Sequence, residues 1–256
     1  MMDAGNMSGA FVILGIGFFL GMRHATDPDH VVAVSTIVSR ERSISRAGWI
    51  GVFWGIGHTL TILAVGAAII LFGVVIPPRV GLTLEFSVAL MLILLGVLNL
   101  TGAIGWISHF FPRAHAPGRS KPESIERQAG KVAPHWLGAP FASLGLFHSL
   151  RPLVVGIVHG LAGSAAVALL VLGTIRDPHW AIFYLLVFGA GTIVGMMLMT
   201  LAFSVPFTVA GNRLAWLNRS LVATTGVVSL LFGLVVAYQI GIVDGLFTAH
   251  PTWTPH

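Results

Sequence analysis

Six long apolar stretches limit what this chain of 256 residues can fold into. Crossing a bilayer as a helix takes about 20 mostly apolar residues, and each stretch is long enough. Only 9% of the residues are Asp, Glu, Lys or Arg, whereas a soluble domain carries roughly 25%. The sequence therefore predicts an all-α integral membrane protein with six transmembrane helices. It excludes a soluble enzyme, a nucleic-acid-binding domain and a disordered chain. The predicted spans are about 10–38, 47–73, 84–107, 152–175, 179–205 and 220–243.

The distribution of basic residues predicts the orientation in the membrane. Eleven of the fourteen Lys and Arg residues fall after the first, third or fifth span, and only Arg79 and Arg176 fall on the opposite side. Cytoplasmic loops carry the excess of Lys and Arg, so we expect 39–47, 108–151 and 206–219 in the cytoplasm and both termini outside. The first span lacks the basic region and cleavage site of a signal peptide and is expected to stay in the membrane. These features predict a multi-pass protein of the cytoplasmic (inner) membrane.

The two halves of the chain resemble each other at low resolution. The first and fourth spans each carry a histidine followed by small or polar residues, at His24 and His159, while the second and fifth spans are rich in glycine. Two units of three spans must have opposite orientations, which is the inverted-repeat plan of many secondary transporters. We expect two three-helix repeats, 1–107 and 152–256, joined by a cytoplasmic linker at 108–151. The alternative is the ordinary recurrence of Gly, Ala and Leu in a membrane bundle.

The densest group of ionisable residues lies near the middle of the first span. It consists of Arg23, His24, Asp27, Asp29 and His30. Each charged side chain at bilayer depth costs roughly 2.5–3.5 kcal/mol on insertion scales, so such residues face a cavity or a partner and mark a functional site. The simpler alternative is a salt bridge between Arg23 and one Asp with hydrogen-bonded histidines. A purely structural pair would not need two histidines and a second carboxylate.

Pro28 predicts that the first helix is broken within this group. Proline has no N–H, and its ring clashes with the carbonyl of the residue four positions earlier, which is His24. It also moves the preceding residue, Asp27, out of the helical region. On an unbroken helix Asp29 would point away from the face that carries His24, Asp27 and His30. We therefore expect the break to let Asp29 join the other side chains.

The residue types in this group favour a transition metal. The chain has no cysteine, so nitrogen and oxygen atoms must be the principal ligands. Imidazoles combined with carboxylates suit Ni²⁺, Co²⁺ or Zn²⁺ better than Ca²⁺ or Mg²⁺. His58 in the second span is a candidate third imidazole, although a lone intramembrane histidine is more often a packing residue. The predicted metal ligands are His24, Asp27, Asp29, His30 and His58.

Three further residues are candidates for the ion pathway or for supporting contacts. His159 in the fourth span either hydrogen-bonds to a ligand or lines the pathway. Thr192 in the fifth span offers a hydroxyl, although threonine more commonly joins helices to one another. Arg23 either pairs with Asp27 when no metal is bound or lies at the edge of the cavity.

Two motifs resemble those of the nickel/cobalt transporter (NiCoT) family. Residues 23–31, Arg-His-Ala-Thr-Asp-Pro-Asp-His-Val, resemble the hallmark Arg-His-Ala-x-Asp-Ala-Asp-His-Ile, with Pro28 where the family usually has Ala. Residues 53–59, Phe-Trp-Gly-Ile-Gly-His-Thr, are similar to a second, aromatic-rich motif that ends in Gly-His-Ser/Thr. The resemblance implies uptake of Ni²⁺ or Co²⁺. It also implies that His24, Asp29 and His30 are essential, with Asp27 and His58 in support.

The second half of the chain departs from the family pattern. Eight-span members carry an acidic motif of the type Leu-Gly-x-Asp-Thr-Ala-Thr-Glu, whereas residues 158–165 here, Val-His-Gly-Leu-Ala-Gly-Ser-Ala, contain no acid. The chain thus resembles the shorter, six-span, urease-accessory-type branch of the superfamily. That branch implies a cytoplasmic metallochaperone, or a urease or hydrogenase maturation system, as a partner.

These observations predict a secondary transporter and not an enzyme. The sequence has no P-loop, so the membrane potential or an ion gradient must supply the energy. A divalent cation entering the cell gains about 4.6 kcal/mol at 100 mV, from about 2.3 kcal/mol per charge. We expect no cofactor, and Ni²⁺ (or Co²⁺) as the transported ion. The alternatives are an exporter that uses the same site and a membrane metalloenzyme. The His-Glu-x-x-His motif of metalloproteases is absent from the sequence.

Overall fold

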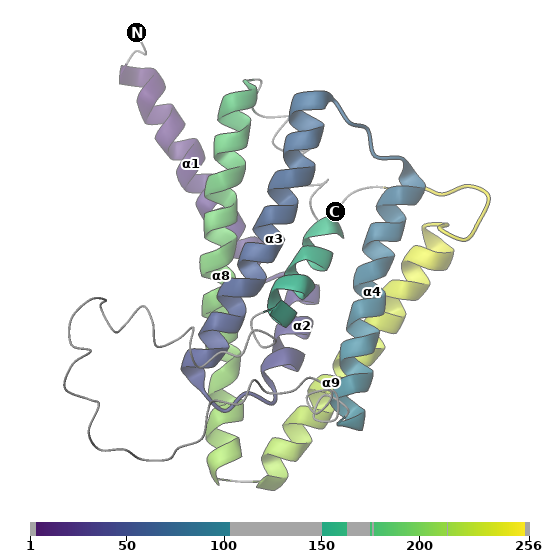
Figure 1. Cartoon of the computed structure of the whole chain (residues 1–256). Helices are drawn as coiled ribbons and strands as arrows, with labels where there is room; N and C mark the ends of the chain where they lie inside the picture. The colour runs from purple at the N-terminus through teal and green to yellow at the C-terminus, as the bar shows by residue number, and fades with distance from the viewer. Residues whose placement is uncertain (1–3, 103–149, 163–174, 176, 214, 254–256) are drawn as a thin grey trace, which may run out of the picture.

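The computed structural model describes residues 4–102, 150–162, 175, 177–213 and 215–253 (Figure 1). Within these ranges the chain is helical with short connections, as predicted. Four helices are long and apolar enough to cross a membrane, and three shorter apolar helices accompany them. The described helices are α1 (Ala4–His24), α2 (Pro28–Val38), α3 (Ile44–Phe72), α4 (Pro78–Thr101), Leu150–Ala162, α8 (Pro178–Arg213) and α9 (Ala215–Tyr238), followed by a π-helical turn at Gln239–Val243.

Helices α3, α4, α8 and α9 correspond to the second, third, fifth and sixth predicted spans. The first predicted span is divided into α1 and α2, as expected from Pro28. The fourth, at 152–175, is described only as far as Ala162. Its remaining part and almost all of the predicted linker at 108–151 lie outside the described residues.

One predicted loop is helical. We expected the fifth span to end at about residue 205 and a loop to occupy 206–219. Instead α8 continues through Pro206 to Arg213, and α9 begins at Ala215. Prolines are tolerated inside membrane helices because neighbouring groups satisfy the freed backbone carbonyls.

Local sequence signals explain several helix ends. The Ser43 side chain accepts a hydrogen bond from the backbone N–H of Arg46 and caps the start of α3, which is a preferred role of serine. Pro78 is the first residue of α4, where its missing N–H costs nothing. Gly73 and Gly102 follow α3 and α4 with φ of 61° and 71°, the left-handed conformation that favours glycine at helix C-termini.

The helices pack in pairs, with α3 against α8 and α4 against α9 (Figure 1). Helix α1 also packs on α8, and α2 contacts α4, α8 and α9. Small residues allow these close approaches. A Cβ atom at Gly55 of α3 would lie 2.8 Å from Ile193 Cα of α8, and one at Gly195 of α8 would lie 2.7 Å from Ala25 Cβ. Glycines at contacts between membrane helices commonly serve this purpose.

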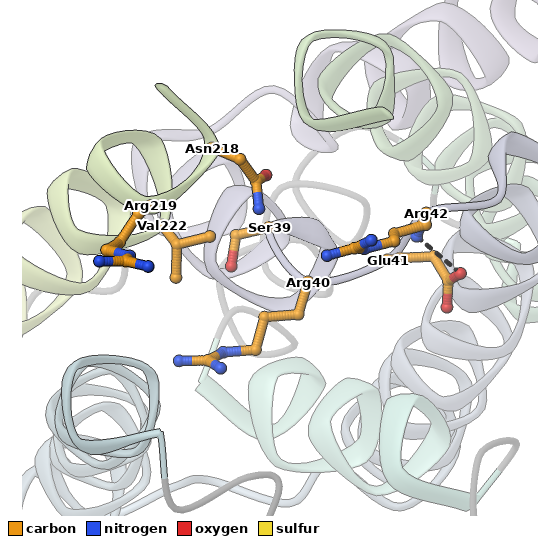
Figure 2. Close-up of a pocket in the computed structure, with 7 residues that line it drawn as sticks. All are labelled: Ser39, Arg40, Glu41, Arg42, Asn218, Arg219 and Val222. Carbon is orange, nitrogen blue, oxygen red and sulfur yellow. Dashed lines mark hydrogen bonds between the residues drawn. The ribbon is translucent and has the colours of Figure 1, made fainter. Parts of the chain in front are cut away.

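The connections of the bundle lie at two opposite ends (Figure 1). The α2–α3 and α8–α9 connections share one end, whereas the N-terminal end of α1 and the α3–α4 connection share the other. Figure 2 shows a pocket of about 440 Å³ at the first of these ends, and its polar lining is mainly basic. Its lining residues are Ser39, Arg40, Glu41, Arg42, Asn218, Arg219 and Val222. Arginines from two predicted cytoplasmic segments therefore gather at one end of the bundle.

Candidate metal site

The break between α1 and α2 shapes the site. The Asp27 N–H donates to the His24 carbonyl, 3.1 Å away, so α1 ends in a tight turn. Asp27 then adopts an extended conformation (φ −61°, ψ 146°) and Pro28 is the first residue of α2. The break predicted from Pro28 is therefore present. It places Asp29 in the first turn of α2, where a carboxylate is stabilised by the helix dipole.

Four imidazole rings from four helices converge beside this break. His24 ends α1, His30 belongs to α2, His58 lies in the middle of α3, and His159 belongs to the helix Leu150–Ala162. The ring centroid of His30 lies 4.9 Å from that of His24, 5.1 Å from that of His58 and 4.2 Å from that of His159. The side chains of His30, His58 and His159 are almost fully buried. We call these four residues the histidine cluster.

His24, His30 and His58 have the spacing of a metal-ligand group. Each offers one nitrogen, and the three nitrogens lie within 4.8 Å of one another. The two closest are the Nε2 atoms of His24 and His58, at 3.1 Å. Zn²⁺ binds imidazole nitrogen at about 2.0–2.1 Å, so two such ligands at a right angle about one ion lie about 3 Å apart. This group can hold a divalent transition metal with little movement.

Asp29 joins two members of the histidine cluster. Its Oδ1 lies 3.1 Å from His30 Nδ1, and its Oδ2 lies 2.7 Å from His159 Nε2. Ligand atoms of Asp29, His30 and His159 also lie within 4.8 Å of one another. The expected approach of Asp29 to the other side chains has therefore occurred. A carboxylate in this position can orient the imidazoles or bind an ion itself.

Asp27 contacts His24 from the other side of the ring. Its Oδ2 lies 2.7 Å from His24 Nδ1, and 46% of its side chain is exposed. Metal-binding histidines commonly donate their second ring N–H to a carboxylate, which fixes the tautomer and the ring orientation. Asp27 therefore orients His24 with Nε2 toward His58. Arg23 is exposed, and among the described residues Asp27 pairs with His24 and not with Arg23.

Several buried polar atoms of the site have no hydrogen-bond partner within the described part of the chain. A buried donor or acceptor that is left unsatisfied costs about 1–3 kcal/mol, and such atoms are uncommon in folded proteins. Their concentration around one cluster is typical of a ligand-binding site. They are His30 Nε2, His58 Nδ1, His159 Nδ1 and Trp54 Nε1.

Trp54 forms a wall of the site that the sequence analysis did not single out. Its indole is completely buried and stacks on His30, with centroids 6.2 Å apart and planes at 25°. It also meets His159 edge to face at 5.8 Å. Trp54 precedes His58 by four residues on α3, so the two side chains share a helix face. That spacing is the signal that could have identified it.

Glycines bring His159 to the cluster. The helix Leu150–Ala162 crosses α3 through Gly156 and Gly160, and a Cβ atom at Gly160 would lie 2.7 Å from the His58 carbonyl oxygen. Two small residues four positions apart are a common contact motif between membrane helices. Thr192 has a different role. Its buried hydroxyl donates to the Phe188 carbonyl of its own helix at 3.0 Å, so this hydrogen bond neither faces the histidine cluster nor joins α8 to another helix.

Two helices connect the histidine cluster to the arginine-lined end of the bundle. Helix α2 has eleven residues and is therefore about 16 Å long. Its last turn contributes to a second pocket of about 150 Å³, which also touches the start of the helix Leu150–Ala162. The residues lining this pocket are Thr36, Ile37, Arg40, Glu41, Ile50, Leu95, Arg151, Pro152 and Val155. Helix α2, which carries Asp29, and the helix Leu150–Ala162, which carries His159, therefore both extend from the cluster to this pocket.

Comparison with known proteins identifies related sequences over most of the chain. The family described as "NicO: High-affinity nickel-transport protein" matches residues 10–247. The chain is 35% identical over 235 residues to the "Urease accessory protein UreH" of Bacillus sp. (strain TB-90), an alignment that covers 92% of this chain and 94% of the relative. No solved structure matches the chain.

Proposed function

Because the chain belongs to the NicO family of high-affinity nickel-transport proteins, we propose that it carries Ni²⁺ into the cell through the histidine cluster. Membership of a transport family also confirms that the chain is a multi-pass membrane transporter and not an enzyme. The predicted resemblance to nickel transporters of the urease-accessory type is confirmed as well. We propose the identity of the transported ion, the residues that bind it and the direction of transport.

The close approach of three imidazoles carries this proposal. His24, His30 and His58 each offer one nitrogen, and the three nitrogens lie close enough together to bind a single ion. Imidazole nitrogen suits Ni²⁺, and by the Irving–Williams order Ni²⁺ binds such ligands more tightly than Co²⁺. We therefore propose Ni²⁺ as the preferred ion and Co²⁺ as the next. Asp29 and Asp27 complete the site by holding His30 and His24 in position.

The charge distribution supports import. The arginines of the predicted cytoplasmic segments lie at one end of the bundle, and Arg79 lies at the start of α4, at the other end. The positive-inside rule then places the α2–α3 and α8–α9 connections in the cytoplasm and the N-terminus outside. A divalent ion moving from the outer end to this inner end follows the membrane potential. We propose the cytoplasmic membrane as the location.

The packing of the helices supports the proposed repeat of three spans. Helix α3 packs on α8 and α4 packs on α9, so the second span of one proposed repeat contacts the second span of the other, and the third contacts the third. This is the pairing that a two-fold relation between the halves would produce. We propose repeats at 1–107 and 152–256, with the linker 108–151 between them.

The name of the relative links it to urease. We propose that the imported ion is passed to a cytoplasmic metallochaperone or to a urease or hydrogenase maturation system. Export through the same site is the alternative. It predicts that cells expressing the protein lose nickel faster than control cells.

The experiment that tests the proposed function is uptake of ⁶³Ni²⁺ and ⁵⁷Co²⁺ into cells and into liposomes that contain the purified protein. The intact protein should accumulate nickel above an empty control, and the variant His24→Ala should not. The matched control is His179→Ala, which removes an exposed histidine at the start of α8. Absence of accumulation by the intact protein, or normal uptake by His24→Ala, would refute the proposal.

A further inference from the structure

Two groups of potential ligand atoms lie side by side in the site, and they share one residue. His24, His30 and His58 form the first group, and Asp29, His30 and His159 form the second. We propose that these groups are two successive binding positions for one nickel ion, which passes from the first to the second around the ring of His30. This inference rests on the proposed transport function and adds the route of the ion through the site.

The two ring nitrogens of His30 face different surroundings. Nδ1 lies 3.1 Å from Asp29 Oδ1, which belongs to the second group. Nε2 has no hydrogen-bond partner among the residues that the structure describes, and we assign it to the first group because Nδ1 already faces Asp29. The ring of His30 therefore stands between the two positions, with one nitrogen available to each.

A neutral His30 ring can bind an ion at only one of the two positions at a time. In a neutral imidazole one nitrogen carries the proton and the other has the lone pair. The tautomer with the proton on Nδ1 presents Nε2 to the first position, and the tautomer with the proton on Nε2 presents Nδ1 to the second. Interconversion of the two tautomers changes the number of protons on His30 by zero, because one proton passes from Nδ1 to water and another passes from water to Nε2. A single ion thus occupies one position at a time.

The elements that carry each group give the order of the two positions. His24 and His58 lie on α1 and α3, whereas Asp29 and His159 lie on α2 and on the helix Leu150–Ala162. The last two helices continue to the pocket of about 150 Å³ between Thr36 and Val155, and the end of α2 also borders the larger pocket in Figure 2. Helix α3, which carries His58, also reaches this pocket at Ile50, but α1, which carries His24, begins at the opposite end of the bundle. We therefore assign the second position to the side of the arginine-lined end.

The ligand types agree with this order. The first group offers three imidazoles, which suit Ni²⁺, whereas the second replaces one of them by a carboxylate, a ligand better suited to Mg²⁺, Ca²⁺ or Mn²⁺. Capture at the tighter position followed by transfer to the weaker one allows release. A transported ion must bind well enough to enter and weakly enough to leave.

A simpler arrangement gives a different result for His159. If Asp29 and His159 only hold His30 in place, then loss of His159 loosens a ligand of the first position and weakens nickel binding at equilibrium. If His159 belongs to the second position, its loss leaves binding at the first position intact and slows transfer. Binding and transport therefore have to be measured on the same variant.

The test compares His159→Gln with His58→Gln, and the exposed-histidine variant His179→Gln is the control. Equilibrium dialysis with ⁶³Ni²⁺ gives the affinity of the purified protein in detergent, and proteoliposomes give the initial rate of uptake. We expect His159→Gln to bind one ion with a dissociation constant within about threefold of the intact protein and to transport at least about tenfold more slowly. Loss of a ligand or of its supporting partner typically costs about 10–100-fold in metal affinity, so His58→Gln should lose at least about tenfold in binding.

Two results would overturn the inference. One is a loss of affinity in His159→Gln as large as that in His58→Gln, and the other is uptake by His159→Gln at the rate of the intact protein. If His159→Gln does not elute as a folded species on gel filtration, His159→Asn is measured with the same criteria. Failure of the proposed function looks different, because the intact protein would then neither bind nor transport nickel.

Discussion

His159 Nε2 and Asp29 Oδ2 lie 2.7 Å apart although 130 positions separate the two residues in the sequence. This contact joins the helix Leu150–Ala162 to the first turn of α2. It ties the second half of the chain to the motif of the first half, and it gives Asp29 a partner on each of its oxygens. The break at Pro28 therefore shapes the site by setting the position of Asp29.

Replacement of Asp29 by asparagine should impair transport more than the same replacement of Asp27. The amide would keep the shape of the Asp29 side chain but lose the charge that attracts both imidazoles and the ion, whereas Asp27 is about half exposed and contacts only His24 in the described site. We expect Asp29→Asn to lower the initial rate of ⁶³Ni²⁺ uptake at least about tenfold, in the range seen for supporting partners of metal ligands, and Asp27→Asn to have the smaller effect. Equal effects would show that Asp29 has no special role.

Replacement of Pro28 by alanine should weaken nickel binding. With an N–H and no ring at position 28, the helix can continue from α1 into α2 and turn Asp29 away from His159. The matched control is Pro78→Ala, because Pro78 is likewise the first residue of a helix and lies outside the site. Equilibrium dialysis with ⁶³Ni²⁺ measures both variants. Unchanged affinity in Pro28→Ala would show that the break does not position Asp29.

Replacement of Gly160 by alanine should force α3 and the helix Leu150–Ala162 apart. The added Cβ would lie 2.7 Å from the His58 carbonyl oxygen, and overpacking of this kind costs about 1–3 kcal/mol. We expect a lower melting temperature of the purified protein and slower uptake. Gly15→Ala is the control, because a Cβ at Gly15 meets nothing within 4 Å. An unchanged melting temperature in Gly160→Ala would contradict the close contact between α3 and the helix Leu150–Ala162.

Replacement of Asn99 by leucine should lower stability and leave the nickel site intact. The buried Asn99 side chain donates to the Val222 carbonyl and to the Thr225 hydroxyl of α9, and it accepts from Arg40 Nε at the end of α2. Leucine removes these three hydrogen bonds, each of which contributes about 0.5–1.5 kcal/mol. We expect a lower melting temperature with unchanged nickel affinity per folded molecule. A tenfold weaker affinity would show that this junction also shapes the metal site.

The sequence predicted the parts of the site that depend on local chemistry. Pro28 indicated the break because its effect on the preceding turn is local, and His58 indicated a third imidazole because a polar ring at bilayer depth needs a partner. A hydrogen bond from His159 to a ligand was one of two alternatives, but Asp29 could not be identified as the partner, since that contact depends on how the helix Leu150–Ala162 crosses α3. The role of Trp54 was missed for the same reason.

The bounds of α3 were predicted to within three residues, whereas α4 begins and ends six residues earlier than expected and α8 continues past its expected end to Arg213. Capping residues fix the ends of α3 and α4, whereas the passage of α8 through Pro206 depends on its neighbours in the bundle. The three-helix repeats and the roles of the ligands stay predictions. Arg23 illustrates why, because one of its two expected roles was a pair with Asp27, and Asp27 contacts His24 in the folded chain.

X-ray absorption spectroscopy of the nickel-loaded, purified protein tests the central claim most directly. We expect three imidazoles around the bound ion, at a distance close to the zinc–imidazole value of about 2.0–2.1 Å, and two in His58→Gln. His179→Gln should give the spectrum of the intact protein. A nickel ion surrounded by oxygen alone, or the same number of imidazoles in His58→Gln as in the intact protein, would contradict the claim that the histidine cluster binds the transported ion.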